Sequence, residues 1–275
     1  MSGVAVVTGA SSGIGAATAV RLAEAGYHVV AAARRSDRVE ALAEQIRGKG
    51  GRAEARTLDV TDRAAVDALA ASLDRCDVLV ANAGGAMGGD QIADGSADDW
   101  RAMYEVNVLG VLHVTQALLP ALRATGDGAI VTFSGGGATA PLPRVHAYAA
   151  SKAGIVRLTE NLAAELAEDG ITINAIGPGF VATSIHDVVL AAGPERAGPL
   201  LPRTERQLAE GGVPTQASAE LAVFLLSSDA RAISGKLISA EWDDWRDAEF
   251  RARLAADPDL ATLRRIDDQL YRRVQ

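Results

Sequence analysis

Short apolar runs that alternate with longer segments of helical period constrain the fold of this chain most. The runs are rich in Val, Ile and Ala and cover Val4–Thr8, His28–Ala33, Arg52–Thr57, Val78–Ala81, Ala129–Phe133, Thr172–Ile176 and Leu237–Ala240. Helical periodicity marks the segments near residues 13–25, 36–48, 62–74, 98–124, 147–168 and 216–228, and several of these begin with a Ser, Thr or Asp suited to an N-cap. Apolar strands that alternate with helices are typical of a parallel sheet covered on both faces. The sequence therefore predicts an α/β fold with a doubly wound parallel sheet.

Two regions interrupt this alternation. Residues 184–214 mix Gly, Pro and charged residues after the sixth strand, where loops of such sheets cover the ligand, so we interpret them as a substrate lid. After the last strand, Asp257 can cap a helix and Pro258 can occupy its first position. An apolar stripe follows, made of Leu260, Leu263, Ile266, Leu270 and Val274. We expect a single domain over residues 1–240 and a C-terminal helical tail over residues 241–275.

Composition narrows the classes of function. The chain has 275 residues, 48% of them hydrophobic, and a net charge of -8, which disfavours a nucleic-acid surface because phosphate binding needs clustered Lys and Arg. Its single cysteine, Cys76, cannot form an internal disulfide and suits a reducing cytosol. No apolar window approaches the ~18 residues of a membrane span. We expect a cytoplasmic protein with a small-molecule substrate and without a nucleic-acid, membrane or metal partner.

The segment TGASSGIG, Thr8 to Gly15, joins the first predicted strand to the first predicted helix. Glycines at positions 9, 13 and 15 allow a tight turn, close approach of the backbone to a phosphate, and close packing of the helix on the strand. Ser11, Ser12 and Ile14 complete this loop, and the helix N-terminus offers unpaired N–H groups to an anion. In this strand–turn–helix context the pattern predicts a dinucleotide site of the Rossmann type.

The end of the second predicted strand distinguishes between two cofactors. NAD sites commonly place Asp or Glu there to bind the ribose 2′-hydroxyl, whereas Arg accommodates a 2′-phosphate. Here the strand ends in Ala33 and continues with Arg34 and Arg35. Because guanidinium groups suit a phosphate, the sequence favours NADP(H), with NAD(H) as the alternative.

Tyr148 and Lys152 are spaced four residues apart, so that on a helix both side chains project from one face. Tyrosine is a poor base at neutral pH, but a neighbouring ammonium favours the phenolate. The pair therefore indicates general acid/base chemistry, with the Tyr148 pKa expected to be lowered by Lys152.

Over about residues 3–240 the sequence resembles the short-chain dehydrogenase/reductase family. The resemblance rests on ordered motifs: TGASSGIG; LDVTD with Asp59 and Val60; ANAGG with Asn82, Ala83 and Gly84; VNVLG with Asn107; YAASK with Tyr148 and Lys152; and IGPGFVAT with Pro178, Gly179, Val181 and Thr183. Any one of these motifs could be accidental. Their order and spacing together identify the family.

The resemblance implies a role for each matched residue. Tyr148 would exchange a proton with the substrate oxygen, Lys152 would bind the nicotinamide ribose, and Asn107 would hold a water in a proton relay. Asp59 and Val60 would contact adenine, the Asn82 motif would line the cofactor cleft, and the motif from Pro178 to Thr183 would lie beside the nicotinamide. The family also suggests a homodimer or homotetramer built on the helices near 98–124 and 147–168.

The chain departs from the family at its fourth catalytic residue, a serine usually 13 positions before the tyrosine. That position is Gly135, and Ser134 lies one residue earlier, where a regular strand points a side chain to the opposite face. Three interpretations follow: the glycines at 135–137 re-aim Ser134 into the cleft; Thr139, His146 or a water donates instead; or the redox activity has changed.

The pattern as a whole predicts an oxidoreductase that interconverts a ketone and a secondary alcohol. Two other classes are compatible with Gly135. One is an isomerase or lyase on the same fold, and the other is a redox-silent dinucleotide-binding protein.

Overall fold

A computed structural model describes residues 3–86, 91–183 and 186–264. Seven strands form a single sheet in the order β3-β2-β1-β4-β5-β6-β7, and every neighbouring pair is parallel. The strands are β1 (Val4–Thr8), β2 (His28–Ala33), β3 (Arg52–Thr57), β4 (Val78–Ala81), β5 (Ala129–Phe133), β6 (Thr172–Gly177) and β7 (Leu237–Ser239). The predicted α/β fold with a doubly wound parallel sheet is confirmed, with five strand ranges as expected, β6 one residue longer and β7 one residue shorter.

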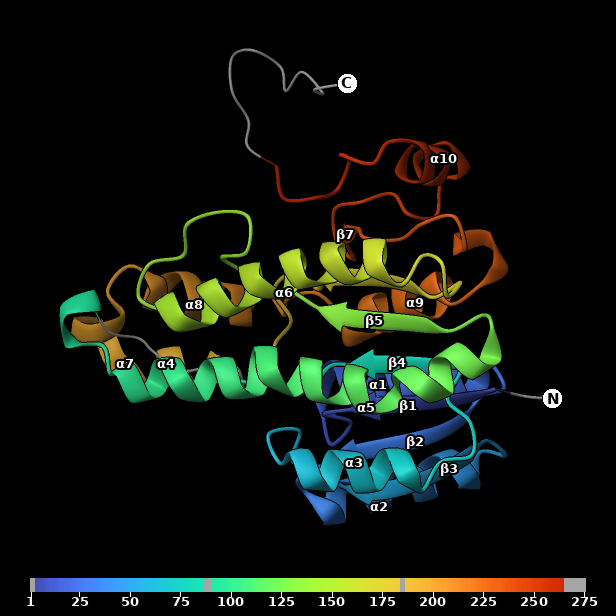
Figure 1. The fold of residues 1–275 in the computed structure, drawn as a ribbon. Coiled ribbons are helices and arrows are strands. Elements are labelled where there is room, and N and C mark those ends of the chain that lie inside the picture. The colour runs from blue at the N-terminus through green and yellow to red at the C-terminus, as the bar shows by residue number, and fades with distance from the viewer. Residues whose placement is uncertain (1–2, 87–90, 184–185, 265–275) are drawn as a thin grey trace.

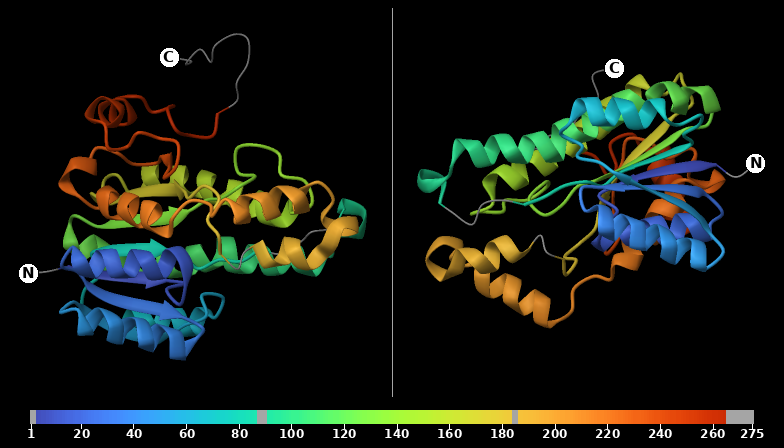
Figure 2. Two further views of the ribbon diagram at one scale, coloured as in Figure 1. Left: turned by 180° about the vertical axis from the view of Figure 1, so that it is seen from behind. Right: turned by 90° about the horizontal axis from the view of Figure 1, so that it is seen from below.

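Helices cover both faces of this sheet, as Figures 1 and 2 show. The helices are α1 (Gly13–Glu24), α2 (Ser36–Gly48), α3 (Arg63–Ala71), α4 (Ala97–Tyr104), α5 (Gly110–Thr125), α6 (His146–Glu165), α7 (Asp187–Ala197), α8 (Leu200–Ala209), α9 (Thr215–Leu225) and α10 (Ala248–Ala256). One face carries α3, α5 and α6, and the other carries α1, α2 and α9.

The inner strands divide their side chains between two apolar cores. In β1, Ala5 and Val7 belong to the core beneath α1, α2 and α9, whereas Val6 belongs to the core beneath α3, α5 and α6. This alternation follows from the two-residue period of a strand, and burial on both faces explains why the inner strands are largely apolar, whereas the edge strand β3 carries charged residues.

The helical stretch Ala97–Thr125, which runs through α4, a π-helical turn at Glu105–Leu109 and α5, is long and apolar enough to cross a membrane by length and composition alone. In this fold its apolar residues pack on the sheet. Val111, Val114 and Leu118 are buried against the sheet, as expected of a core helix.

The segment interpreted as a substrate lid contains two helices, α7 and α8, which pack on each other. A break at Gly193, with φ +70°, interrupts α7, and Pro194 follows it. The two helices lie beside the carboxyl ends of the strands, at the same end of the sheet as α4 (Figure 2). Residues 184–185, which the expected lid also included, lie outside the described residues.

The described part of the C-terminal tail contains one helix, α10, but the helix expected to begin at Asp257 is not found over residues 257–264. Asp257 does not begin a helix; it follows α10, whose N-cap Asp247 accepts a hydrogen bond from the Phe250 N–H. Residues 257–264 have no regular structure, and Ile266, Leu270 and Val274 lie outside the described residues. Pro258 disfavours a helical conformation in the residue before it, which is consistent with the end of α10.

Tertiary contacts explain the shape of the segment 257–264. Lys236 donates from Nζ to the carbonyl oxygens of Asp257 at 2.5 Å and Leu260 at 2.9 Å. The Leu237 N–H of β7 donates to the Ala261 carbonyl at 2.8 Å. These backbone acceptors are therefore satisfied by the domain instead of by a helix of their own.

Candidate active site

A cavity of about 1200 Å³ extends along the carboxyl ends of the strands. Its walls come from the glycine-rich loop, the end of β2, the segments after β4 and β5, α6, the loop after β6, α7, α8 and the tail. All but two of the site residues expected from the sequence line this cavity: Gly9, Ser11, Ser12, Gly13, Ile14, Arg34, Arg35, Asp59, Val60, Asn82, Ala83, Gly84, Ser134, Tyr148, Lys152, Pro178, Gly179, Val181 and Thr183. Gly15 and Asn107 lie behind its walls.

The glycine-rich loop packs closely on the segment after β4. Gly9 has φ +68°, in the left-handed region that favours glycine. A Cβ on Gly15 would come within 2.5 Å of the Gly9 carbonyl oxygen and would also collide with Asn82 Nδ2. Asn82 donates from Nδ2 to the carbonyl oxygens of Thr8 and Gly9, at 3.0 and 3.3 Å. Asn82 therefore fixes the loop from behind and leaves its opposite side open to the cavity.

The N-terminus of α1 faces the same cavity. Its N-cap Ser12 makes no side-chain hydrogen bond to the first helical turn, and Gly13 and Ile14 line the cavity wall. N–H groups at a helix N-terminus attract anions. This end of the cavity can therefore hold a phosphate group.

Two arginine side chains follow the end of β2 and lie near the glycine-rich loop. Arg35 donates from Nη2 to the Ser11 and Ser12 hydroxyls, both at 2.7 Å, and from Nε to Ser11 at 3.1 Å. Arg34 Nη1 lies 4.0 Å from Asp59 Oδ2, and the Arg34 side chain is 74% exposed. No carboxylate stands at the last position of β2, which is Ala33. The electrostatics of this corner suit an additional phosphate.

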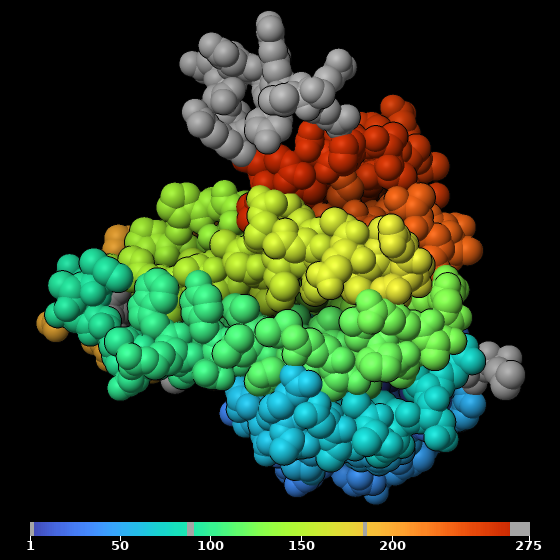
Figure 3. Space-filling view, in the orientation of Figure 1, coloured from blue at the N-terminus to red at the C-terminus, as the bar shows by residue number. Residues whose placement is uncertain are grey.

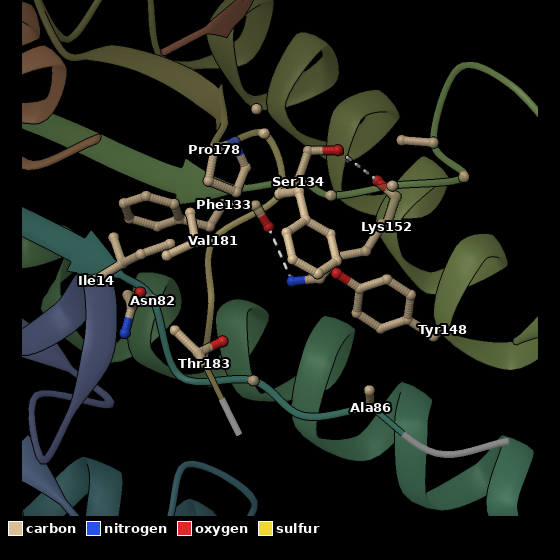
Figure 4. A pocket seen from close by; sticks show the side chains of 18 of the residues that line it. Ile14, Asn82, Ala86, Phe133, Ser134, Tyr148, Lys152, Pro178, Val181 and Thr183 are labelled. Carbon is tan, nitrogen blue, oxygen red and sulfur yellow. Dashed lines mark hydrogen bonds between the residues drawn. The ribbon is translucent and has the colours of Figure 1, made fainter. Parts of the chain in front are cut away.

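Tyr148 and Lys152 lie one turn apart on α6, and both line the cavity (Figure 4). Lys152 donates from Nζ to the Phe133 carbonyl oxygen at 3.0 Å, and Nζ lies 5.7 Å from the centre of the Tyr148 ring. Burial raises the pKa of Tyr148 to about 12 and lowers the pKa of Lys152 to about 8. The expected lowering of the Tyr148 pKa by Lys152 is not seen in this structure, where desolvation shifts that pKa upward.

Asn107 lies in the π-helical turn Glu105–Leu109 and is 1% exposed. Its Oδ1 accepts from the Gly85 N–H at 2.9 Å, and its Nδ2 donates to the Gly85 carbonyl at 3.1 Å and to the Ser151 hydroxyl at 3.0 Å. The side chain thereby ties the segment after β4 to α6, beside Lys152.

Ser134 does not face Tyr148. Its Oγ donates to the Lys152 backbone carbonyl at 3.3 Å, as the dashed line in Figure 4 shows, and the residue is 3% exposed. The residue lines the cavity, but the expectation that the glycines turn its hydroxyl toward the reacting group is corrected, because the hydroxyl is bound to the Lys152 carbonyl. Ser134 follows β5 directly and keeps the alternation of a strand, so that Gly135 is the residue that faces the Tyr148 hydroxyl.

The remaining wall of the cavity comes from the loop after β5, from the segment interpreted as a substrate lid, and from the tail, and the individual residues were not predicted. Leu142 and Val145 come from the loop after β5, and Val189 and Leu200 come from α7 and α8. The tail adds Glu241, Trp242, Phe250, Leu260 and Ala261. These residues carry no catalytic pattern, and the exposed Trp242 in an otherwise polar segment is their clearest sequence signal.

A glycine-rich loop of the dinucleotide-binding type and a half-buried tyrosine beside a buried lysine, all in one cavity, are typical of a nucleotide-dependent oxidoreductase. Residues 3–192 match the family model for short chain dehydrogenases. The chain belongs to this family. It is an oxidoreductase that acts on CH–OH or carbonyl groups with NAD(P).

Three proteins illustrate the similarity of this chain to known members in sequence and in fold. An uncharacterized oxidoreductase of Mycobacterium tuberculosis is 49% identical over 194 residues, which cover 70% of this chain and 75% of that protein. The crystal structure of a variant actinorhodin polyketide ketoreductase with NADPH matches with a TM-score of 0.78 and 31% identity, covering 86% of this chain and 95% of the other. A 3-ketoacyl-(acyl-carrier-protein) reductase from Brucella melitensis, complexed with NADH, matches with a TM-score of 0.76 and 28% identity over 86% and 96%.

Proposed function

We propose that this protein is an NADP(H)-preferring oxidoreductase that interconverts a ketone and a secondary alcohol, with Tyr148 as the general acid/base. The observation that carries this proposal is the position of Tyr148 and Lys152. Lys152 is buried and Tyr148 is half-buried in the wall of the cavity that the glycine-rich loop enters from its other end. The actinorhodin ketoreductase and the Brucella reductase, both named for ketone reduction, have the same fold.

The cavity fits a nicotinamide dinucleotide. The open glycine-rich loop and the free first turn of α1 suit its pyrophosphate, and Arg34 and Arg35 suit a 2′-phosphate. Asp59 is placed to bind a polar group of the nucleotide. Although burial raises its pKa, hydrogen bonds from the Thr61 N–H and hydroxyl and the charge of Arg34 together hold the pKa below its usual range, so Asp59 stays ionised. A bound nicotinamide would supply or accept the hydride.

Tyr148 supplies the proton in the direction of reduction. With a pKa of about 12 its hydroxyl is protonated at neutral pH, so it can donate a hydrogen bond to a carbonyl oxygen and transfer the proton as negative charge develops there. The Lys152 ammonium, one helical turn away, stabilises the resulting phenolate. In the direction of oxidation the Tyr148 phenolate, formed once the hydroxyl has released its proton, accepts the alcohol proton.

Assembly and location are also proposed. A homodimer or homotetramer would use the face over α5 and α6, which Figure 3 presents, and Tyr104 and Leu109 are exposed on the helical stretch at that face. We propose a cytoplasmic location, a small-molecule carbonyl or alcohol substrate, a lid at residues 184–214, and a C-terminal extension from residue 241 that adds a wall to the cavity.

Cofactor titration tests this proposal. Fluorescence titrations with NADPH and NADH give the two dissociation constants, and absorbance at the reduced nicotinamide band then follows turnover on a panel of ketones. We expect binding of both cofactors, tighter for NADPH, and oxidation of NADPH by at least one ketone. Tight binding without turnover on any carbonyl compound would favour a redox-silent nucleotide-binding protein instead.

A further inference from the structure

The loop that follows β5 approaches α6 unusually closely through its glycines. A Cβ built on Gly135 would collide with the Tyr148 hydroxyl oxygen and would lie 3.2 Å from Tyr148 Cζ. At Gly137, which has φ +87°, a Cβ would lie 2.5 Å from the Ala149 Cβ. The contact of the Gly135 Cβ with the Tyr148 hydroxyl oxygen and that of the Gly137 Cβ with the Ala149 Cβ are both closer than a real Cβ tolerates. The loop backbone therefore rests directly on the first turns of α6, where the family usually places a side chain.

Gly136 lies between these two residues but has no such constraint. A Cβ there would meet only Leu142 Cδ2, at the ordinary contact distance of 3.4 Å, and its φ does not lie in the left-handed region. The close approach is thus specific to Gly135 and Gly137. The same loop supplies a matched control position at Gly136.

The contacts around Gly135 show which group would have to move. The loop is held on one side by the Ser134 N–H, which donates to the Ile176 carbonyl at 2.9 Å, and on the other by the turn in which the Ala138 N–H donates to the Gly135 carbonyl at 3.2 Å. Gly137 cannot retreat into α6 because of Ala149. The Tyr148 hydroxyl end, which borders the cavity, is the free end of this contact.

We propose that Gly135 is a positioning residue for Tyr148: the space that a side chain at position 135 would occupy holds the Tyr148 hydroxyl. This inference rests on the proposed role of Tyr148. The glycine therefore does more than remove a serine hydroxyl from the site. Any side chain at position 135, including that of serine, would displace the Tyr148 hydroxyl toward the cavity. Tyr148 is the side chain that donates to the substrate oxygen, without a partner from position 135.

Two substitutions of equal size separate this idea from a simple loss of serine. Gly135→Ala and Gly135→Ser add the same Cβ, but only the second adds a hydroxyl. We expect both to lower kcat for ketone reduction with NADPH by about 10²-fold, the cost of a misplacement near 1 Å, and to leave the NADPH dissociation constant within a few-fold. The control Gly136→Ala should keep kcat within about twofold. A kcat for Gly135→Ser at or above that of the wild type would overturn the proposal.

A second readout does not depend on activity. Difference absorbance of tyrosinate, with Tyr148→Phe as the reference, gives the Tyr148 pKa, which should fall from about 12 toward its ordinary value when the ring is displaced into water. An unchanged Tyr148 pKa in Gly135→Ala would contradict the proposal. If Tyr148→Phe retains full activity, the proposed function fails, and this titration still decides the position of the ring.

Thermal stability is a third readout, and it can still be interpreted if the single variants fold poorly. Removing the hydroxyl relieves most of the collision, so Gly135→Ala should lower Tm less in the Tyr148→Phe background than in the wild type. If Gly135→Ala does not fold but the double variant does, the contact with Tyr148 is the reason and the proposal is supported. Equal losses in both backgrounds, or failure of both to fold, would show that something other than Tyr148 excludes a side chain and would overturn it.

Discussion

Replacement of Arg34 by alanine tests the proposed preference for NADPH. Arg34 lies at the corner of the cavity after β2, and the part of the chain that the structure describes gives it one ionic neighbour, Asp59 Oδ2 at 4.0 Å. Its guanidinium is therefore available for a 2′-phosphate. Hydrogen bonds to charged groups contribute about 1.5–3 kcal/mol, and the 74% exposure of this side chain reduces that through solvent screening. We expect a loss near 1–2 kcal/mol, which is about 5- to 30-fold in the dissociation constant of NADPH.

NADH lacks the 2′-phosphate, so its dissociation constant should change less than about twofold in Arg34→Ala. Arg35→Ala provides a contrast, because Arg35 also supports Ser11 and Ser12 of the loop, so its loss should weaken NADH as well as NADPH. Arg38→Ala, exposed on α2 and absent from the cavity wall, is the matched control. Fluorescence titration at low and high salt measures all of these, and the NADPH effect should shrink as salt rises. Equal losses of NADPH and NADH in Arg34→Ala would refute the reasoning.

Three further predictions concern residues around the site. Ser134→Ala should keep kcat within about twofold and cost about 0.5–1.5 kcal/mol on denaturation, because its hydroxyl serves the Lys152 carbonyl; a 10²-fold loss of kcat would contradict this. Lys236→Met should lower the free energy of unfolding by about 2–4 kcal/mol, because the Lys236 ammonium donates to two carbonyl oxygens of the tail. Urea titration measures this loss, and an unchanged unfolding midpoint would show that these two hydrogen bonds do not stabilise the fold. Burial lowers the pKa of Lys152 from 10.5 to about 8, so between these two pH values the unfolded chain binds more protons than the folded one. The free energy of unfolding should therefore rise with pH across that window. The rise should be absent in Lys152→Met, and an equal rise in that variant would show that other groups cause it.

The sheet was predictable because its strands are short apolar runs between clear breaks. A strand that is buried on both faces is apolar along its whole length, so it can be recognised from the local sequence alone, as in Val78–Ala81. The same holds for Tyr148 and Lys152, whose spacing alone places them on one face of a helix. Strand parity also indicated that Ser134 would point away from the cleft unless the glycines intervened, and the structure follows parity.

The tail and the pKa of Tyr148 were not predictable in this way, because both depend on distant partners. Asp257 and Pro258 match the local signals of a helix start, but Lys236 and the edge of β7 bind the following carbonyls. The sequence places an ammonium near Tyr148 and says nothing of how much water either group loses. That loss decides the direction of the pKa shift.

The most direct test of the central claim is kcat for ketone reduction in Tyr148→Phe, measured with NADPH at saturation and accompanied by the NADPH dissociation constant. The substitution removes the hydroxyl and keeps the ring. General acid catalysis contributes about 10²- to 10⁴-fold, so we predict a loss of kcat in that range with cofactor binding within a few-fold of the wild type. An unchanged kcat in this variant would contradict the assignment of Tyr148 as the acid/base.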